Sequence, residues 1–270
     1  MLIIDLIKSL ILGIVEGITE WLPISSTGHM ILVNEFIKNT GFTSSDLYIY
    51  VIQLGAILAV VTLYFKKLNP FSPSKTQKEK KDTWTMWFKV VAACIPAAVI
   101  GLLLNDFMEK FENWYVVSAT LIIYGIAFLF IERKNKLAPI TEMNQLTYKT
   151  AILIGLFQVL SIIPGTSRSG STILGAMLIG CSRSLAAEFS FFLAIPVMVG
   201  VSALKILTTD QPLDFNNIII LLTGMVVAYA VSMVAIKGLV NYVRKHNFKS
   251  FGYYRIILGI IVILYFTLIG

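Results

Sequence analysis

Two glutamates and a group of hydroxyl side chains lie close together in an otherwise apolar part of this chain. The stretch reads EGITEWLPISSTGHM and covers residues 16 to 30. Glu16 and Glu20 are four residues apart, so on a helix the two carboxylates share one face. Paired carboxylates suit a divalent cation or a proton transfer. The alternative is an interfacial helix whose acidic edge faces water.

Three hydroxyl residues and a histidine follow Pro23 in the same stretch. Ser26 precedes His29 by three residues, so the two side chains can meet across one helical turn, as a base-assisted nucleophile requires. The alternative is that Ser25, Ser26 or Thr27 caps a helix that begins after the proline. The two roles are compatible, because one hydroxyl can cap the helix while another reacts.

A second polar cluster, PGTSRSGST, covers residues 164 to 172. Its glycines permit a sharp turn and a close approach of the backbone to a ligand. Arg168 stands among Ser167, Ser169, Ser171 and Thr172 at the expected N-terminus of a helix. Free N–H groups, hydroxyls and a guanidinium together predict a phosphate site. Alternatively, the arginine merely neutralises the glutamates of the first cluster.

Membrane-spanning helices must position these clusters. The chain has 270 residues, of which 57% are hydrophobic and 14% charged, whereas soluble domains carry roughly 25% charged residues. A span needs about 18 apolar residues, and uncharged runs that reach or approach this length predict six spans: 47–65, 90–105, 113–131, 189–204, 215–236 and 256–270. Ionisable groups inside such a protein are costly enough to indicate function.

The loops between the spans alternate in charge. Basic loops at 66–82, 132–149 and 237–249 are predicted to be cytoplasmic, and acidic loops at 105–113 and 208–217 to lie outside. This places both termini outside. The net charge of +7 therefore reflects topology and contact with membrane lipids, and we expect no nucleic acid. Cys94 and Cys181 stand alone in apolar surroundings and indicate packing, with no disulfide or metal site.

The two polar clusters lie in segments that the six spans leave unused, 1–40 and 147–182, and each is predicted to form a re-entrant hairpin broken at a proline. The hairpins resemble each other, since Gly13, Glu16, Ser25 and Gly28 align with Gly155, Gln158, Ser167 and Gly170. Three spans follow each hairpin, and an odd number inverts the second copy. The sequence predicts one all-α polytopic membrane domain, residues 1–270, with inverted-topology repeats at approximately 1–135 and 147–270.

Both hairpins would then meet near the membrane midplane and bind a phosphate-bearing ligand there. The residues leave open whether that ligand is cleaved or carried, and the nucleophile-like cluster favours hydrolysis. The alternative is a transporter or flippase of an anionic lipid.

The motifs resemble those of a known family. EGITE resembles an (E/Q)xxxE motif followed by a PxSSTGH run, and PGTSRSGST resembles PGxSRSxxT. This pair is typical of undecaprenyl-diphosphate phosphatases of the bacitracin-resistance type, the BacA/UppP family, and the resemblance covers essentially the whole chain. A second class of lipid phosphatases, the type 2 phosphatidic acid phosphatases, needs a KxxxxxxRP element and a histidine downstream of the SR pair. In this chain no such basic element precedes the first motif, and no histidine occurs between His29 and His246.

The resemblance implies a bacterial plasma-membrane enzyme that hydrolyses undecaprenyl diphosphate to the monophosphate carrier of cell-wall precursors. It implies dependence on a divalent cation, Mg²⁺ or Ca²⁺, and an active site that opens toward the outer face. Glu16 and Glu20 would be the essential acidic pair and the cation ligands, Arg168 the phosphate clamp, and Ser26 and His29 competing nucleophiles. The further phosphate-binding residues would be Ser25, Thr27, Ser167, Ser169 and Thr172. A homodimer is left open.

Overall fold

The structure is a computed structural model that describes residues 2–111, 113–134 and 138–268. Within these ranges the chain is helical and contains no β-strand. Short 3₁₀ turns separate several of the helices. The α-helices are α1 (Leu2–Thr19), α2 (Ser26–Phe36), α3 (Asp46–Leu63), α4 (Phe65–Leu68), α5 (Gln77–Met108), α6 (Trp114–Lys134), α7 (Tyr148–Val159), α8 (Arg168–Ile179), α9 (Arg183–Thr208), α10 (Phe215–Lys245) and α11 (Lys249–Leu268).

Six of these helices are long and apolar enough to cross a membrane: α3, α5, α6, α9, α10 and α11. They coincide with the six predicted spans, and the all-α membrane class is confirmed. Several helices continue beyond the uncharged runs, α10 as far as Lys245, because long cationic side chains at a helix end can reach the interface. Parts of the predicted loops and of the last span, at residues 112, 135–137 and 269–270, lie outside the described residues.

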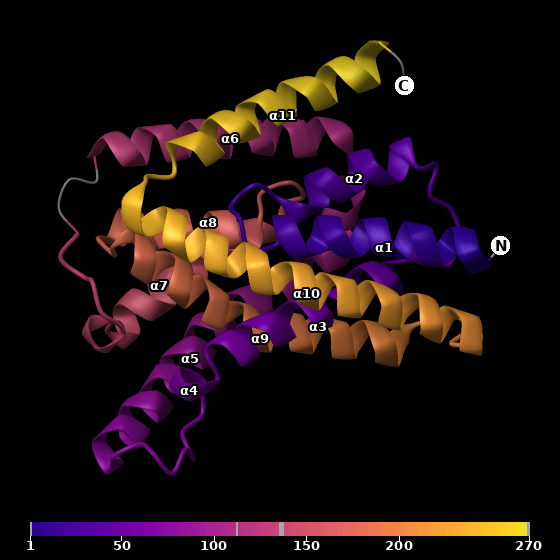
Figure 1. The fold of residues 1–270 in the computed structure, drawn as a ribbon. Helices are drawn as coiled ribbons and strands as arrows, with labels where there is room; N and C mark the ends of the chain where they lie inside the picture. The colour runs from indigo at the N-terminus through magenta and orange to yellow at the C-terminus, as the bar shows by residue number, and fades with distance from the viewer. Residues whose placement is uncertain (1, 112, 135–137, 269–270) are drawn as a thin grey trace.

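Two pairs of helices occupy the segments predicted to form hairpins, and α1, with 18 residues, is the longest of the four. The chain breaks between α1 and α2 and again between α7 and α8, close to the prolines at 23 and 164. α2, α7 and α8 have 11 or 12 residues, too few to cross roughly 30 Å of hydrocarbon at about 1.5 Å per residue. α1 and α2 lie at one end of the bundle and α7 and α8 at the other (Figure 1). This arrangement is compatible with re-entrant hairpins.

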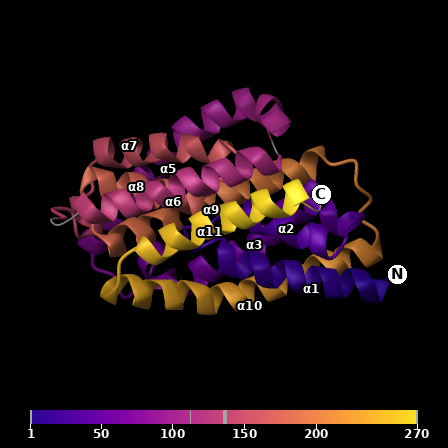
Figure 2. The same cartoon turned by 90° about the horizontal axis from the view of Figure 1, so that it is seen from above.

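Several helix pairs recur in both halves of the chain. α1 packs on α10 as α7 packs on α5, while α3 pairs with α9 and α6 with α11, and α6 and α11 run side by side in both views (Figure 2). Gly13 of α1 contacts the backbone of Gly224 in α10, and Gly155 of α7 contacts Ala93 in α5. Small residues allow such close approach between membrane helices. The inverted repeat remains a prediction, and this packing is what a repeat requires.

The second hairpin lies deep in the bundle. Every residue of α8 from Ser169 to Met177 is buried. The largest apolar cluster surrounds it and includes Phe191 and Phe192 of α9, neither of which is exposed. The helix that begins at Arg168 is therefore enclosed by protein, and its first turn faces the first hairpin rather than lipid.

We expect Gly155→Ala to lower thermal stability in detergent, because the added Cβ would overlap the backbone of Ala93. Overpacking of this kind costs about 1–3 kcal/mol. Gly200→Ala is the matched control, since a Cβ there meets no atom within 4 Å and alanine favours helix. Thermal unfolding followed by fluorescence compares them, and equal unfolding midpoints would show that the α5–α7 contact is not tight.

Candidate active site between the two hairpins

The second helix of each hairpin begins with the same unusual backbone. Ser25 and Ser167 have φ angles of 72° and 73°, a conformation that L side chains rarely adopt. Their hydroxyls accept hydrogen bonds from the N–H groups of Gly28 at 3.3 Å and Gly170 at 3.0 Å. Ser25 is therefore the residue that caps α2, and Ser167 caps α8. Each break holds a helix N-terminus, with its free N–H groups, in the centre of the protein.

One carboxylate joins the two hairpins. Arg168 donates from Nη2 to Glu20 Oε1 at 2.9 Å, and Ser26 donates from Oγ to Glu20 Oε2 at 2.8 Å. The side chains of the ion pair are only 11% and 8% exposed. The guanidinium also donates to the Ser190 carbonyl at 2.8 Å and lies over the Trp21 ring. Residues 148 positions apart in sequence thus form one polar centre.

The other hydroxyls of the second hairpin hold this centre together. Ser169 Oγ donates to the carbonyls of Glu20 at 3.0 Å and Leu22 at 3.1 Å, so it bridges the hairpins. Thr172 shares a hydrogen bond of 2.7 Å with the Ser190 hydroxyl. Ser190 was not predicted from sequence, because a serine within an apolar span has no distinguishing signal.

Arg255 of α11 donates hydrogen bonds to backbone carbonyls in both chain breaks. Its side chain is fully buried and donates to the carbonyls of Pro23 at 3.2 Å, Gly165 at 3.0 Å and Thr166 at 3.1 Å. Those carbonyls lack helical partners because the helices are interrupted there. Sequence reasoning missed this residue, although an arginine directly before the last uncharged run was a usable signal.

Glu16 lies one helical turn before Glu20. The Glu20 N–H donates to the Glu16 carbonyl at 3.0 Å, so the helical turn continues and the two carboxylates share a face. Glu16 is 1% exposed, and its Oε1 has no hydrogen-bond partner within the described part of the chain. A buried carboxylate oxygen without a partner is costly, so a cation or a proton would be favourable there.

A divalent cation fits Glu16 and Glu20 if substrate phosphates supply its remaining ligands. Among the described residues, no group of three or more His, Cys, Asp and Glu could hold a metal ion. Mg²⁺, however, is commonly bound by one or two carboxylates together with substrate phosphates. The pair Glu16 and Glu20 suits such a shared site.

Among the hydrogen bonds of the described residues, none joins His29 to Ser26. Its Nδ1 lies 2.7 Å from the Ser25 carbonyl and its Nε2 lies 2.7 Å from the Tyr254 hydroxyl of α11. The structure therefore joins Ser26 to a carboxylate rather than to the imidazole. Thr27 is half-buried in the first turn of α2.

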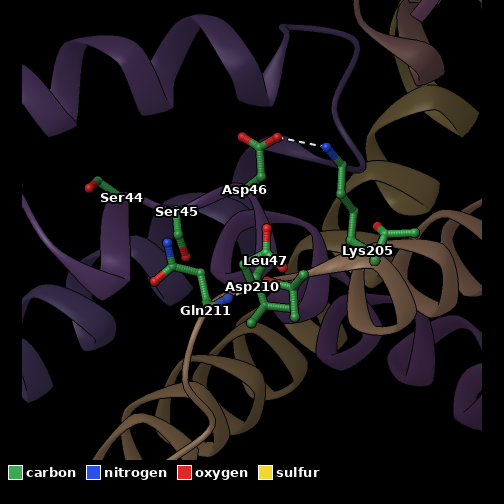
Figure 3. Close-up of a pocket in the computed structure, with 9 residues that line it drawn as sticks. Ser44, Ser45, Asp46, Leu47, Lys205, Asp210 and Gln211 are labelled. Carbon is green, nitrogen blue, oxygen red and sulfur yellow. Dashed lines mark hydrogen bonds and ion pairs between the residues drawn. The ribbon is translucent and has the colours of Figure 1, made fainter.

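A separate hollow of about 490 Å³ lies where α3 begins and α9 ends. Lys205 and Asp46 form an ion pair of 2.6 Å at its rim, with Ser44, Asp210 and Gln211 nearby (Figure 3). None of the predicted site residues lines this hollow. The predicted site residues Glu20, Ser26 and Arg168 instead lie together between the hairpins.

The fold and the site define a multi-pass membrane protein in which Glu20, Ser26 and Arg168 form a polar centre between two broken helices. The model of the family "Bacitracin resistance protein BacA" matches residues 9–261. The chain belongs to this family and is a multi-pass bacterial membrane protein.

Curated relatives match the chain over nearly its whole length. An undecaprenyl-diphosphatase of Enterococcus faecalis is 58% identical, with 98% of this chain and 99% of that protein covered. One of Acetivibrio thermocellus is 57% identical, covering 97% and 98%. One of Latilactobacillus sakei is 56% identical, also covering 97% and 98%.

Proposed function

We propose that this chain hydrolyses undecaprenyl diphosphate to undecaprenyl phosphate and inorganic phosphate, and so recycles the lipid carrier for cell-wall precursors. The observation that carries the proposal is the contact of Glu20 with both Arg168 and Ser26. It places a cation, a hydroxyl and a proton acceptor in one enclosed centre, and the relatives named undecaprenyl-diphosphatase support it.

Arg168 and the N-terminus of α8 bind the terminal phosphate in this proposal. Phosphoryl transfer depends mostly on positioning and charge stabilisation, and a guanidinium matches phosphate geometry with two parallel hydrogen bonds. In the structure, Glu20 occupies the guanidinium that the substrate would use. Phosphate binding would therefore release Glu20 from the ion pair and leave it free to accept a proton.

Ser26 is the nucleophile that the geometry favours. Its hydroxyl already donates to Glu20 Oε2, so its proton passes to that carboxylate as Oγ attacks the terminal phosphorus. The bond from this phosphorus to the bridging oxygen breaks, and undecaprenyl phosphate leaves. Water then hydrolyses the phosphoserine, releasing inorganic phosphate and restoring the hydroxyl. Direct attack by His29 or by water is the alternative.

Glu16 and Glu20 would hold a divalent cation, Mg²⁺ or Ca²⁺, beside the substrate phosphates. When bound, such an ion supplies positive charge that stabilises the phosphoryl oxygens. The unpartnered Oε1 of Glu16 supports this assignment.

The orientation of the protein in the membrane is inferred from the charges of its loops. We infer that both termini lie outside, that the active site opens toward the outer face of the plasma membrane, and that residues 1–135 and 147–270 are inverted repeats. The matching helix packing of the two halves supports the repeats. A homodimer is compatible with these features and carries no part of the mechanism.

Turnover in detergent tests the function against the carrier alternative. Purified protein mixed with undecaprenyl diphosphate in micelles has no second compartment, so a carrier would leave the lipid unchanged. We expect inorganic phosphate and undecaprenyl phosphate in equal amounts, with release suppressed by a chelator and restored by Mg²⁺ or Ca²⁺. An unchanged lipid with folded protein would favour the transporter, and movement of the lipid across vesicles would then be measured.

A further inference from the structure

Two groups hold the His29 imidazole, one at each ring nitrogen. The carbonyl of Ser25 lies 2.7 Å from Nδ1, and the Tyr254 hydroxyl lies 2.7 Å from Nε2. The His29 and Tyr254 rings are nearly parallel, with an interplanar angle of 3° and centroids 5.6 Å apart. Both contacts have the length of strong hydrogen bonds.

These partners determine which nitrogen carries the proton. A carbonyl oxygen can only accept, so the hydrogen of the neutral imidazole lies on Nδ1. Nε2 then presents its lone pair and accepts from the Tyr254 hydroxyl. The basic nitrogen of His29 therefore faces the Tyr254 hydroxyl of α11.

Tyr254 is well placed to fix the first hairpin. It precedes Arg255, which binds the carbonyl of Pro23 in the chain break. Consecutive residues of α11 thus hold the first hairpin at two points, the backbone before α2 and the imidazole within it. The Tyr254 side chain is 44% exposed, so this contact lies at the boundary of the protein rather than in the core.

We propose that Tyr254 is a positioning residue that, by donating to Nε2, reinforces the Nδ1–H form of His29 favoured by the Ser25 carbonyl and leaves Nε2 as the basic nitrogen. The proposal deepens the proposed function, on which its activity readout rests, because His29 would then take a proton at Nε2 when water hydrolyses the phosphoserine, and the Tyr254 hydroxyl would turn from donor to acceptor. Water loses that proton as its oxygen bonds to phosphorus, and the departing Ser26 oxygen regains a proton from Glu20. The tautomer itself can be tested without any turnover.

Nitrogen NMR of labelled histidine reads the tautomer directly. The chain has two histidines, so His246→Gln leaves His29 as the only signal. With ¹⁵N-histidine at about pH 8.5, where an ordinary imidazole is neutral, we expect the shifts of a protonated Nδ1 and an unprotonated Nε2. Tyr254→Phe in this background removes the donor, so the Nε2–H form should gain population.

The neighbouring tyrosine provides the control. Tyr253 is 57% exposed and has no hydrogen-bond partner among the described residues, so Tyr253→Phe should leave the spectrum unchanged. An Nε2–H form in the parent, or identical spectra of the parent and Tyr254→Phe, would overturn the proposal. Both phenylalanine variants keep the ring, and size-exclusion chromatography checks that they fold.

Phosphate release gives the second readout. Loss of the partner that orients a metal-ligating histidine typically costs about 10–100-fold in activity, and by the same orienting effect we expect Tyr254→Phe to lower kcat by about tenfold with KM unchanged. Tyr253→Phe should match the parent. A kcat of Tyr254→Phe equal to that of an active parent would overturn the positioning role. A parent that shows the expected tautomer but no turnover would instead contradict the proposed function and leave the tautomer inference standing.

Discussion

Glu20→Gln is expected to lower kcat for phosphate release by about 10³-fold, within the range for loss of a general base. Glutamine keeps the shape of the side chain but removes the charge that pairs with Arg168 and the proton acceptor for Ser26. Steady-state release of phosphate from undecaprenyl diphosphate measures the effect. KM should not rise through loss of this ion pair, because the uncharged amide no longer competes with substrate for the guanidinium.

Glu35→Gln is the matched control for this change. Glu35 belongs to α2, the second helix of the same hairpin, and is exposed, so its loss should leave kcat near that of the wild type. Nearly full activity of the Glu20 variant would contradict the assignment of this carboxylate as the proton acceptor. Equal losses in both variants would point to a general effect of charge on the hairpin.

Ser26→Ala is expected to reduce activity by at least about 10³-fold, because a covalent route cannot proceed without its nucleophile. The change removes one hydroxyl and should leave the fold intact, since Ser26 is half-buried and donates only to Glu20 among the described residues. Phosphate release under single-turnover conditions measures the chemical step alone.

Ser169→Ala is the comparison variant for Ser26→Ala, since it also removes one hydroxyl from the centre. Ser169 donates to two backbone carbonyls, so its loss should weaken the contact between the hairpins and cost less than about tenfold in activity, as expected when individual hydrogen bonds are worth about 1 kcal/mol. If Ser26→Ala keeps substantial activity while His29→Ala loses it, the imidazole would replace Ser26 as the nucleophile.

The spans and the chain breaks could be predicted from sequence because both are local properties. Uncharged runs marked the six membrane-spanning helices, and Pro23 and Pro164 marked the breaks. The aligned pair Ser25 and Ser167 proved to share one backbone conformation and one capping bond.

The partners within the site could not be predicted, since they depend on tertiary packing. Tyr254 lies 225 positions from His29. It belongs to α11, and no local sequence pattern shows that α11 packs beside α2. The spacing of Ser26 and His29 permitted a contact across one turn. In the structure the imidazole instead bonds to the carbonyl of Ser25 on its own helix, while Glu20 takes the Ser26 hydroxyl.

Arg183→Ala is the matched control for Arg168→Ala, because it shows how much activity is lost when an ion pair with a buried carboxylate is broken away from the proposed site. Like Arg168, Arg183 pairs with a buried carboxylate, that of Glu132, so removing either arginine strands a buried charge and lowers stability. Arg183 lies at the start of α9, two turns before Ser190, and contacts none of the proposed catalytic residues among those described.

Phosphate release from undecaprenyl diphosphate by purified Arg168→Ala and Arg183→Ala, each confirmed as folded by size-exclusion chromatography, tests most directly whether the two hairpins form one phosphatase site. The account predicts a loss of about 10²–10³-fold or more for Arg168→Ala, the range for removing one preorganised transition-state donor, and nearly wild-type turnover for Arg183→Ala. Wild-type turnover by Arg168→Ala, or equal losses in the two variants, would contradict it.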